Sequence, residues 1–407
     1  MPEAIAIIGG GQAAAVAART LRRRGYDGRI EIIGAERHRP YQRPPLSKEY
    51  LAGEDGDELF LLPERWCADA DVRLRLGVAA RRIRPEAGVV ELADGDELPA
   101  DAVLIATGGR PRGLPGVTGD RVHYLRTVDD SDRLRERLRP GARLIVIGAG
   151  FIGSEVAATA RTRGAEVVIV EAMDVPMAQL LGPLAGAACA EIHRRAGVTV
   201  RLGERVESVT ETSTGVVVTT SGGARIAGDA AVVGVGIEPN TEVAADSGIA
   251  VADGVVVDER CRSSMPNVYA AGDVAGHDHP LFGERIRVEH FDNASRQARA
   301  AADAMLGRGG VFDDPHWFWS DQYGRNLQYT GHAAASDRMV VRGSLAELDF
   351  TAFYLRDGVL RAAFAVDRGT DIMAAKELVA ARARIDPAVL ADEDTDLMEL
   401  TIGQELP

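Results

Sequence analysis

A glycine turn near the start of this chain has the residue types and spacing that bind the phosphates of a dinucleotide. Gly9, Gly11 and Ala14 follow the apolar run IAII at the first, third and sixth positions of that pattern. The first glycine permits a tight turn, the second lets backbone amides approach a pyrophosphate, and the small third residue lets a helix pack on its strand. The next apolar run, RIEII, ends at Gly34, so the acid expected at a ribose is displaced to Glu36.

A second glycine turn strengthens this interpretation, because a single pattern is also compatible with an ordinary tight turn. Gly148, Gly150 and Gly153 follow LIVI at the same spacing, and the run AEVVIV then leads to Glu171. A carboxylate there accepts hydrogen bonds from ribose hydroxyls and repels a 2′-phosphate, and residues 172–174 contain no arginine, so NADH is favoured over NADPH. The simpler alternative for Glu171 is a solvated acid at a strand end. Two turns in one chain indicate two bound dinucleotides and electron transfer between them.

Lysine is rare in this chain, which contains 47 basic residues but only two lysines, Lys48 and Lys376. Lys48 follows Pro44 and Pro45, whose restricted backbone presents a compact ammonium from a stiff segment. It is therefore a candidate for electrostatic chemistry, although a surface lysine at a helix start is the simpler interpretation. Lys376, in DIMAAKELVAARA, is most simply part of a solvated helix face.

Composition limits the class of protein. The chain has 407 residues, of which 46% are hydrophobic, and this is enough for two or three domains with proper cores. A formal net charge of −14 argues against nucleic acid or an anionic membrane as the main partner. No leader or membrane-spanning apolar run is visible, so we expect a soluble cytoplasmic protein. Cys67, Cys189 and Cys261 are widely separated and are expected to be small buried hydrophobes, with no disulfide framework or metal site.

Strand-like and helix-like runs alternate along most of the chain, and the pattern changes to strands followed by helices near its end. We therefore predict an α/β fold with two Rossmann-like dinucleotide-binding domains, the second inserted in the first, and a C-terminal α+β domain. The predicted boundaries are 1–110 and 237–311 for the first domain, 111–236 for the inserted domain, and 312–407 for the C-terminal domain.

Motifs spread over nearly the whole chain resemble those of the FAD-dependent, NADH-using ferredoxin reductases of bacterial oxygenase systems. In order, they are IIGGGQAA, RPPLSK, LIATGGRPR, YLRT, VIGAGFIGSEVAATA, GIEPN, AAGDVA and PHWFWSDQY. The resemblance implies a glutathione reductase-like fold with FAD and NAD(H) as cofactors. Disulfide-reducing members of that fold group carry a cysteine pair beside the flavin, whereas residues 39–50 contain no cysteine. The resemblance therefore implies that electrons leave the flavin directly.

The resemblance also implies individual roles around FAD. Phe291 stands where the family commonly has a tryptophan, so an indole hydrogen bond is not available there. The simpler alternatives are a helix cap for Asp273 and a core position for Trp319. The residues expected at the pyrophosphate, ribose and adenine are Gly9, Gly11, Ala13, Ala14, Glu36 and Ala80, and those expected near the flavin and ribityl chain are Arg43, Lys48, Thr107, Gly108, Arg126, Asp273, Phe291 and Trp319.

For the nicotinamide dinucleotide, the resemblance implies binding by the second glycine turn, Glu155 and Glu171. Glu155 is expected to bond the nicotinamide carboxamide and to pair with Lys48. These two residues are the expected catalytic residues, and they would act electrostatically while hydride passes from NADH to FAD. An ordinary acid near a helix N-terminus is the simpler alternative for Glu155.

The function that the resemblance implies is electron transfer from NADH, one electron at a time, to a 2Fe-2S ferredoxin that serves a haem monooxygenase or a Rieske dioxygenase. A reductase of another carrier such as rubredoxin, or an NADH oxidase-like flavoenzyme, is the alternative, although such oxidases generally use a cysteine near positions 43–48. A signalling or nucleic-acid-binding flavoprotein would need a basic face. The arginines that could provide a local positive surface for an acidic ferredoxin are Arg110, Arg112, Arg296 and Arg299, for each of which a solvated side chain is the alternative.

Overall fold

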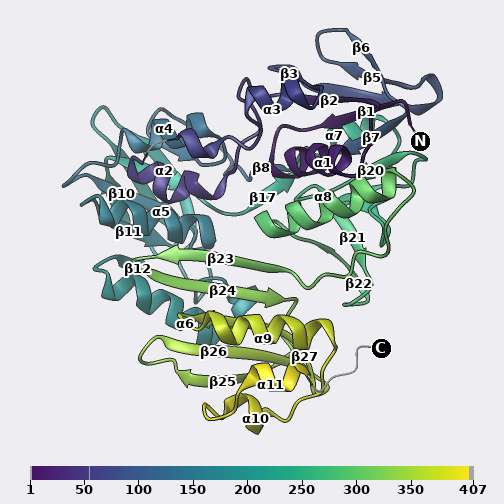
Figure 1. Ribbon diagram of the computed structural model, residues 1–407. Helices are drawn as coiled ribbons and strands as arrows, with labels where there is room; N and C mark the ends of the chain where they lie inside the picture. Colours follow the sequence, from purple (N-terminus) through teal and green to yellow (C-terminus); the bar gives the residue numbers. More distant parts are fainter. Residues whose placement is uncertain (1, 55, 403–407) are drawn as a thin grey trace. The chain divides into compact units, whose positions relative to one another are not determined.

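The computed structural model describes residues 2–54 and 56–402 and divides into two compact units (Figure 1). Each unit is assembled from three separate segments of the chain. The first unit consists of Met1–Arg43, Gly56–Arg110 and Glu238–His316, and the second consists of Pro44–Asp55, Pro111–Ile237 and Trp317–Pro407.

A five-stranded parallel sheet forms the centre of the first unit. Its central strand, β1 (Ala4–Ile8), reads AIAII and is buried along its whole length, as a parallel strand covered on both faces should be. Helices α1 (Gln12–Arg23) and α8 (Phe291–Met305) pack against each other through alanine-rich faces (Figure 1). The strand order is β20 (Val268–Ala270), β7 (Ala102–Ile105), β1, β2 (Arg29–Gly34) and β3 (Val72–Leu76).

Smaller elements complete the first unit, and several of them cover the other face of its parallel sheet with a second apolar cluster. They include one antiparallel sheet, one mixed sheet and short helices. The sheets are β4 (Ala80–Arg84), β5 (Val89–Leu92) and β6 (Glu97–Pro99), and β18 (Val251–Ala252), β19 (Gly254–Val257), β21 (Ala275–His279) and β22 (Glu284–Arg287); the helices are α3 (Glu64–Asp69) and α7 (Glu242–Asp246).

The second unit repeats the same architecture around β10 (Arg143–Ile147), which reads RLIVI and is buried except at its first residue. Helix α5 (Phe151–Thr162) connects β10 to its parallel neighbour β11 (Glu166–Val170). The parallel sheet has the order β12 (Thr199–Arg201), β11, β10, β16 (Ala230–Val233) and β9 (Val122–Tyr124), and it is accompanied by α4 (Val128–Arg135), α6 (Ala178–Arg195) and the antiparallel strands β13 (Val206–Glu211), β14 (Val216–Thr220) and β15 (Arg225–Gly228).

The last part of the chain adds a five-stranded antiparallel sheet to the second unit. Side chains of α6 share a hydrophobic core with this sheet, and α9 (Gly369–Ala380) packs on β27 and β24. The strand order is β23 (Trp317–Gln322), β24 (Arg325–Gly331), β27 (Val359–Val366), β26 (Asp349–Arg356) and β25 (Arg338–Ser344), and the helices α10 (Pro387–Ala391) and α11 (Leu397–Ile402) follow α9.

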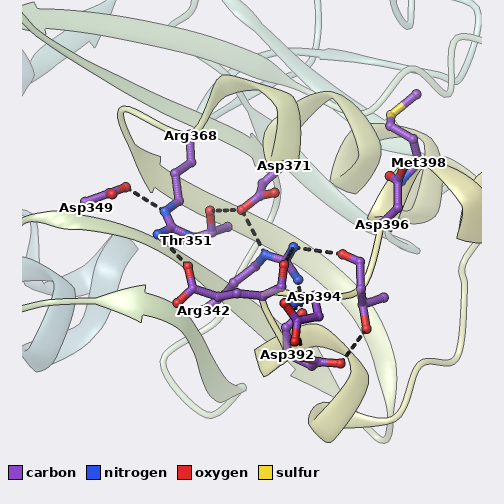
Figure 2. A network of polar contacts seen from close by, with 11 residues as sticks. Arg342, Asp349, Thr351, Arg368, Asp371, Asp392, Asp394, Asp396 and Met398 are labelled. Atoms are coloured by element: carbon purple, nitrogen blue, oxygen red, sulfur yellow. Dashed lines mark hydrogen bonds and ion pairs between the residues drawn. The ribbon is translucent and has the colours of Figure 1, made fainter.

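A buried arginine fastens the segment between α10 and α11 to this sheet (Figure 2). The guanidinium of Arg342, on β25, donates hydrogen bonds to the backbone carbonyls of Asp392, Glu393 and Thr395. Its Nε also lies 3.5 Å from a carboxylate oxygen of Asp371, on α9. Because Arg342 is only 7% exposed, these partners replace the water that its charge has lost.

The predicted α/β class, with two Rossmann-like parallel sheets and a C-terminal α+β region, is confirmed. The chain leaves the first unit within β8 (Gly109–Pro111) and returns within β17 (Ile237–Pro239). The structure groups residues 317–407 with residues 111–237, so the division into domains at 110, 236 and 311 stays a prediction.

Two further observations concern the expectations from sequence. Residues 44–54, which precede the inserted segment by about sixty positions, pack within the second unit. In the described ranges, every helix is too short or too polar to cross a membrane.

Candidate functional site

The first glycine turn has the geometry of a phosphate cradle. Gly9 has a φ of +129°, and a Cβ at this position would overlap the carbonyl oxygen of Ala106, so only glycine fits. Gly11 is the N-cap of α1 and has open space where a side chain would stand. Ala13 and Ala14 are buried, which allows α1 to pack closely. No side chain of the described residues caps α1, so its first backbone N–H groups are available to a pyrophosphate.

The second glycine turn has the same construction. The N–H of Gly148 donates to the carbonyl oxygen of Val170 on the neighbouring strand, and Gly150 is the N-cap of α5, which also lacks a side-chain cap among the described residues. A Cβ at Gly153 would overlap the carbonyl oxygen of Gly148, so the helix can approach the turn only with glycine at this position. Both turns therefore fit a dinucleotide, and their binding roles are proposals that rest on this fit.

Glu171 lies where the register of the second sheet brings a strand end to the glycine turn. Its Oε2 accepts a hydrogen bond from the N–H of Ala149 at 2.7 Å, and its Oε1 accepts one from the N–H of Met173 at 2.8 Å. These backbone amides hold the carboxylate beside the turn. The position is suited to the ribose of a dinucleotide, and this role stays a prediction.

Arg201 is a residue next to the backbone of Glu171 that sequence reasoning missed. The carbonyl oxygen of Arg201 accepts a hydrogen bond from the N–H of Glu171, because β12 is the parallel neighbour of β11. Both carboxylate oxygens of Glu204 bind the Arg201 guanidinium, at 3.0 Å from Nε and 2.7 Å from Nη2. Its charge is thereby matched within the protein. Only strand pairing could have placed it here, because it lies thirty positions after Glu171.

Glu36 and Arg43 form a small polar cluster with Tyr41 in the first unit. Arg43 Nη2 lies 2.6 Å from Glu36 Oε1, the Tyr41 hydroxyl donates to Glu36 Oε2 at 2.5 Å, and Arg43 Nη1 donates to the Tyr41 oxygen at 3.0 Å. Burial opposes the charge of Arg43, but Tyr41 and Glu36 together raise its pKa above the ordinary value. Arg43 thus lies beside the acid expected at a ribose, and its expected place near the flavin ring stays a prediction.

Lys48 and Glu155 form a buried ion pair in the second unit. Lys48 Nζ lies 3.0 Å from Glu155 Oε2, and the two side chains are only 10% and 4% exposed. The hydroxyl of Ser47 also donates to Oε2, at 2.5 Å, while the hydroxyl of Ser320 donates to Oε1 at 2.8 Å. The interpretation of Lys48 as a surface lysine is therefore wrong. Glu155 lies beyond the first turn of α5, so the alternative of an ordinary helix-terminus acid does not account for it.

The short turn that carries Lys48 is fixed from three directions. The 3-10 helix η1 (Pro44–Ser47) immediately precedes Lys48, whose Nζ also donates to the carbonyl oxygen of Pro44 at 3.2 Å. Ser131, on α4, donates to the carbonyl oxygen of Leu46, and Thr159, on α5, donates to that of Ser47. The ammonium is consequently presented by a backbone that two helices hold in place. A short helix, α2 (Glu49–Ala52), follows.

The remaining predicted flavin residues are distributed over both units. In the first unit, the Thr107 hydroxyl donates to the carbonyl oxygen of Asn240, and Gly108 has a positive φ. Asp273 is followed by strand β21 rather than by a helix, so the alternative of a helix cap is wrong. Ala80 begins β4 and Phe291 begins α8 in the first unit; Arg126 precedes α4, and Trp319 stacks on Trp317 within β23, in the second unit.

The comparisons with known proteins cover this whole architecture. A model of the family described as pyridine nucleotide-disulphide oxidoreductase matches residues 3–298, and a model described as reductase C-terminal matches residues 317–401. Rhodocoxin reductase of Rhodococcus erythropolis is 40% identical over 97% of this chain and 93% of its own length. The ferredoxin–NAD(+) reductase component of the anthranilate 1,2-dioxygenase system of Burkholderia cepacia is 39% identical over 96% and 97%.

A solved structure agrees with these sequence matches. The crystal structure of the covalent putidaredoxin reductase–putidaredoxin complex matches with a TM-score of 0.95 and 34% identity, over 99% of both chains. The chain belongs to the ferredoxin reductase family of bacterial oxygenase systems. As a member of this family, it is an oxidoreductase that uses FAD and NAD(H).

The cysteines of this ferredoxin reductase family member are not placed for redox chemistry. Cys67, Cys189 and Cys261 are buried and unpaired, as expected from sequence. Burial raises the pKa of all three thiols, that of Cys189 to about 12, which disfavours the reactive thiolate. These three thiols are therefore not suited to the disulfide reduction after which the broader family is named.

Glu171 provides a test of dinucleotide selection. We expect Glu171→Ala to lower the preference for NADH over NADPH by about tenfold, because the ribose loses an acceptor and a 2′-phosphate is no longer repelled. The preference is measured as the ratio of kcat/KM values for the two dinucleotides. Glu166→Ala, at the opposite end of β11, is the matched control and should leave the ratio unchanged. An unaltered ratio for Glu171→Ala would show that another residue determines the selection.

Proposed function

We propose that this chain takes electrons from NADH and passes them singly to a 2Fe-2S ferredoxin that serves a bacterial monooxygenase or dioxygenase. The observation that carries this proposal is the match over 99% of the chain with a reductase solved in a covalent complex with putidaredoxin. The two glycine turns and the buried Lys48–Glu155 pair supply the binding and electrostatic features that the reaction requires. Because its donor, NADH, is a cytoplasmic metabolite, we also propose that the protein works in the cytoplasm.

In this proposal some residues of the chain bind the cofactors and others stabilise charge. Bound FAD supplies the chemistry that links a two-electron hydride donor to one-electron acceptors. The helix N-termini of α1 and α5 bind phosphates, and Glu171 selects the ribose. Lys48 places a positive charge in a site that is largely closed to water, where it stabilises negative charge that develops on reduction. In this proposal Lys48 and Glu155 are the catalytic residues.

The hydrogen bonds of Glu155 leave room for a substrate. Its Oε2 already accepts from Ser47 and Lys48, whereas among the described residues its Oε1 accepts only from Ser320. A carboxylate oxygen can accept two hydrogen bonds, so Oε1 retains one acceptor site. That site is available to the carboxamide N–H₂ of nicotinamide, which would orient the ring for hydride transfer.

A mixing experiment tests the proposed function. The purified yellow protein should bleach when NADH is added without oxygen, and subsequent addition of a 2Fe-2S ferredoxin and cytochrome c should restore the colour while cytochrome c is reduced. Rubredoxin in place of ferredoxin, and oxygen with no carrier, are the comparison acceptors. Faster reduction of rubredoxin or of oxygen would assign the chain to one of the alternative functions, and a protein that NADH does not bleach would refute the proposal.

Lys48 is the residue whose loss should affect the reductive step most directly. We expect Lys48→Ala to retain FAD and to slow bleaching by NADH about 10–100-fold, because one positioned positive charge is lost. The rate is measured by stopped-flow absorbance at saturating NADH. Lys376→Ala, which removes the chain's other lysine, is the control. Bleaching of Lys48→Ala at the rate of the unmodified protein would remove Lys48 from the mechanism.

The four arginines considered for ferredoxin docking differ in their surroundings. Arg296 pairs with Asp292 at 2.6 Å and Asp314 at 2.5 Å, so its charge is matched within the first unit. Arg110 similarly pairs with Glu238 and Glu242. Arg299 and Arg112 are exposed, which leaves them as the better candidates for a positive contact.

Arg299 gives this idea a direct test. We expect Arg299→Glu to lower kcat/KM for ferredoxin several-fold and to weaken its dependence on salt, because a rim charge mainly changes the association rate. Reduction of ferricyanide by NADH should be unchanged in the same variant. Arg65→Glu, another exposed arginine of the first unit, controls for total charge. Unchanged ferredoxin kinetics in Arg299→Glu would exclude this position from the docking surface.

A further inference from the structure

Strand β23 brings two buried polar side chains to the Lys48–Glu155 pair. Ser320 is fully buried, and its hydroxyl donates to Glu155 Oε1 at 2.8 Å. Gln322 is 1% exposed, and its Nε2 donates to the Ser320 oxygen at 3.0 Å. Because residues two apart in a strand point to the same face, both side chains face away from the exposed Asp321 between them.

The direction of this chain of hydrogen bonds is determined by chemistry. The amide nitrogen of Gln322 can only donate, so the Ser320 oxygen must accept that hydrogen bond. The single hydroxyl proton of Ser320 is then directed to Glu155, which as a carboxylate can only accept. Gln322 thus selects the one orientation in which Ser320 stabilises the carboxylate.

The two oxygens of Glu155 are held from different segments of the chain. Ser47 and Lys48, in residues 44–54, hold Oε2, whereas Ser320, in β23, holds Oε1. A carboxylate bound at one oxygen can still rotate about that contact, but one bound at both oxygens has a defined plane. Loss of the Ser320 contact would therefore leave the carboxylate of Glu155 less firmly oriented. The ammonium of Lys48, which pairs with this carboxylate, would then also be held less firmly.

We propose that Ser320 and Gln322 are positioning residues that orient Glu155, and through it Lys48, for the reaction with the nicotinamide. The catalytic use of the Lys48–Glu155 pair rests on the proposed function. The orientation of Glu155 by Ser320 does not depend on that function. The strand that supplies these residues belongs to the region matched by the reductase C-terminal model, whereas Lys48 and Glu155 belong to the region matched by the pyridine nucleotide-disulphide oxidoreductase model. The C-terminal region thereby contributes to the dinucleotide chemistry.

The two lysines of the chain make this orientation measurable without any reaction. The holoenzyme is treated with a limiting amount of acetic anhydride, and the acetylation of Lys48 is divided by that of Lys376 using mass spectrometry. We expect Ser320→Ala and Gln322→Ala to raise this ratio about threefold or more, because an ammonium that is held less firmly in its buried pair becomes more accessible to the reagent. Ser154→Ala is the matched control, since Ser154 is equally buried and its hydroxyl has no partner among the described residues.

Kinetics then connect the orientation to hydride transfer. We expect Ser320→Ala to slow bleaching by NADH about tenfold in the unmodified background but less than twofold in a Glu155→Gln background, since coupled residues are not additive. Ser320→Thr, which keeps a hydroxyl, should recover most of the rate. Near-ultraviolet circular dichroism verifies that each variant is folded, and Gln322→Ala carries the same test if a Ser320 variant is not.

The two measurements separate the possible failures. An unchanged labelling ratio in both Ser320→Ala and Gln322→Ala, or equal slowing by Ser320→Ala with and without Glu155, would overturn the positioning role. If NADH fails to bleach even the unmodified protein, the proposed function is wrong, whereas a raised labelling ratio would still support the orientation of the pair by β23.

Discussion

The burial of a carboxylate is the constraint around which the second unit is organised. Glu155 is 4% exposed, so its charge must be matched by the protein rather than by water. An ammonium and two hydroxyls meet this requirement, and they come from two segments, residues 47–48 and strand β23, that are far from each other and from Glu155 in sequence. Breaking a buried pair of this kind typically costs about 3–5 kcal/mol, so the segments are held together by the same contacts that prepare the site.

Repetition of one βαβ arrangement explains how a single chain can hold two dinucleotides. In each unit a glycine turn follows the apolar run of a buried strand and leads into a helix whose first N–H groups lack side-chain partners among the described residues. The two copies differ in their acids. Glu171 is held by backbone amides beside its turn, whereas Glu36 is held by Arg43 and Tyr41. The same backbone arrangement thus places two acids in different surroundings.

The sequence predicted the parts of the site that depend on local spacing and missed the parts that depend on strand pairing. The glycine turns and Glu171 were found because turn, helix and strand end follow each other within about twenty-five residues. The pairing of Lys48 with Glu155 was reached only through the resemblance to a family. Ser320 carries no signal, because a serine within a strand looks the same whether its hydroxyl meets water or a buried carboxylate. Arg201 was missed for a similar reason, since only the register of β12 on β11 places it beside Glu171.

The hydrogen bonds of Arg342 make residues 392–395 part of the packed structure of the second unit. One guanidinium binds three backbone carbonyls between α10 and α11, and it is itself largely buried. If a protease removed the chain from Asp392 onward, the buried guanidinium of Arg342 would lose its three backbone hydrogen-bond acceptors. Removal of residues 392–395 would therefore leave the buried charge of Arg342 without most of its hydrogen-bond partners.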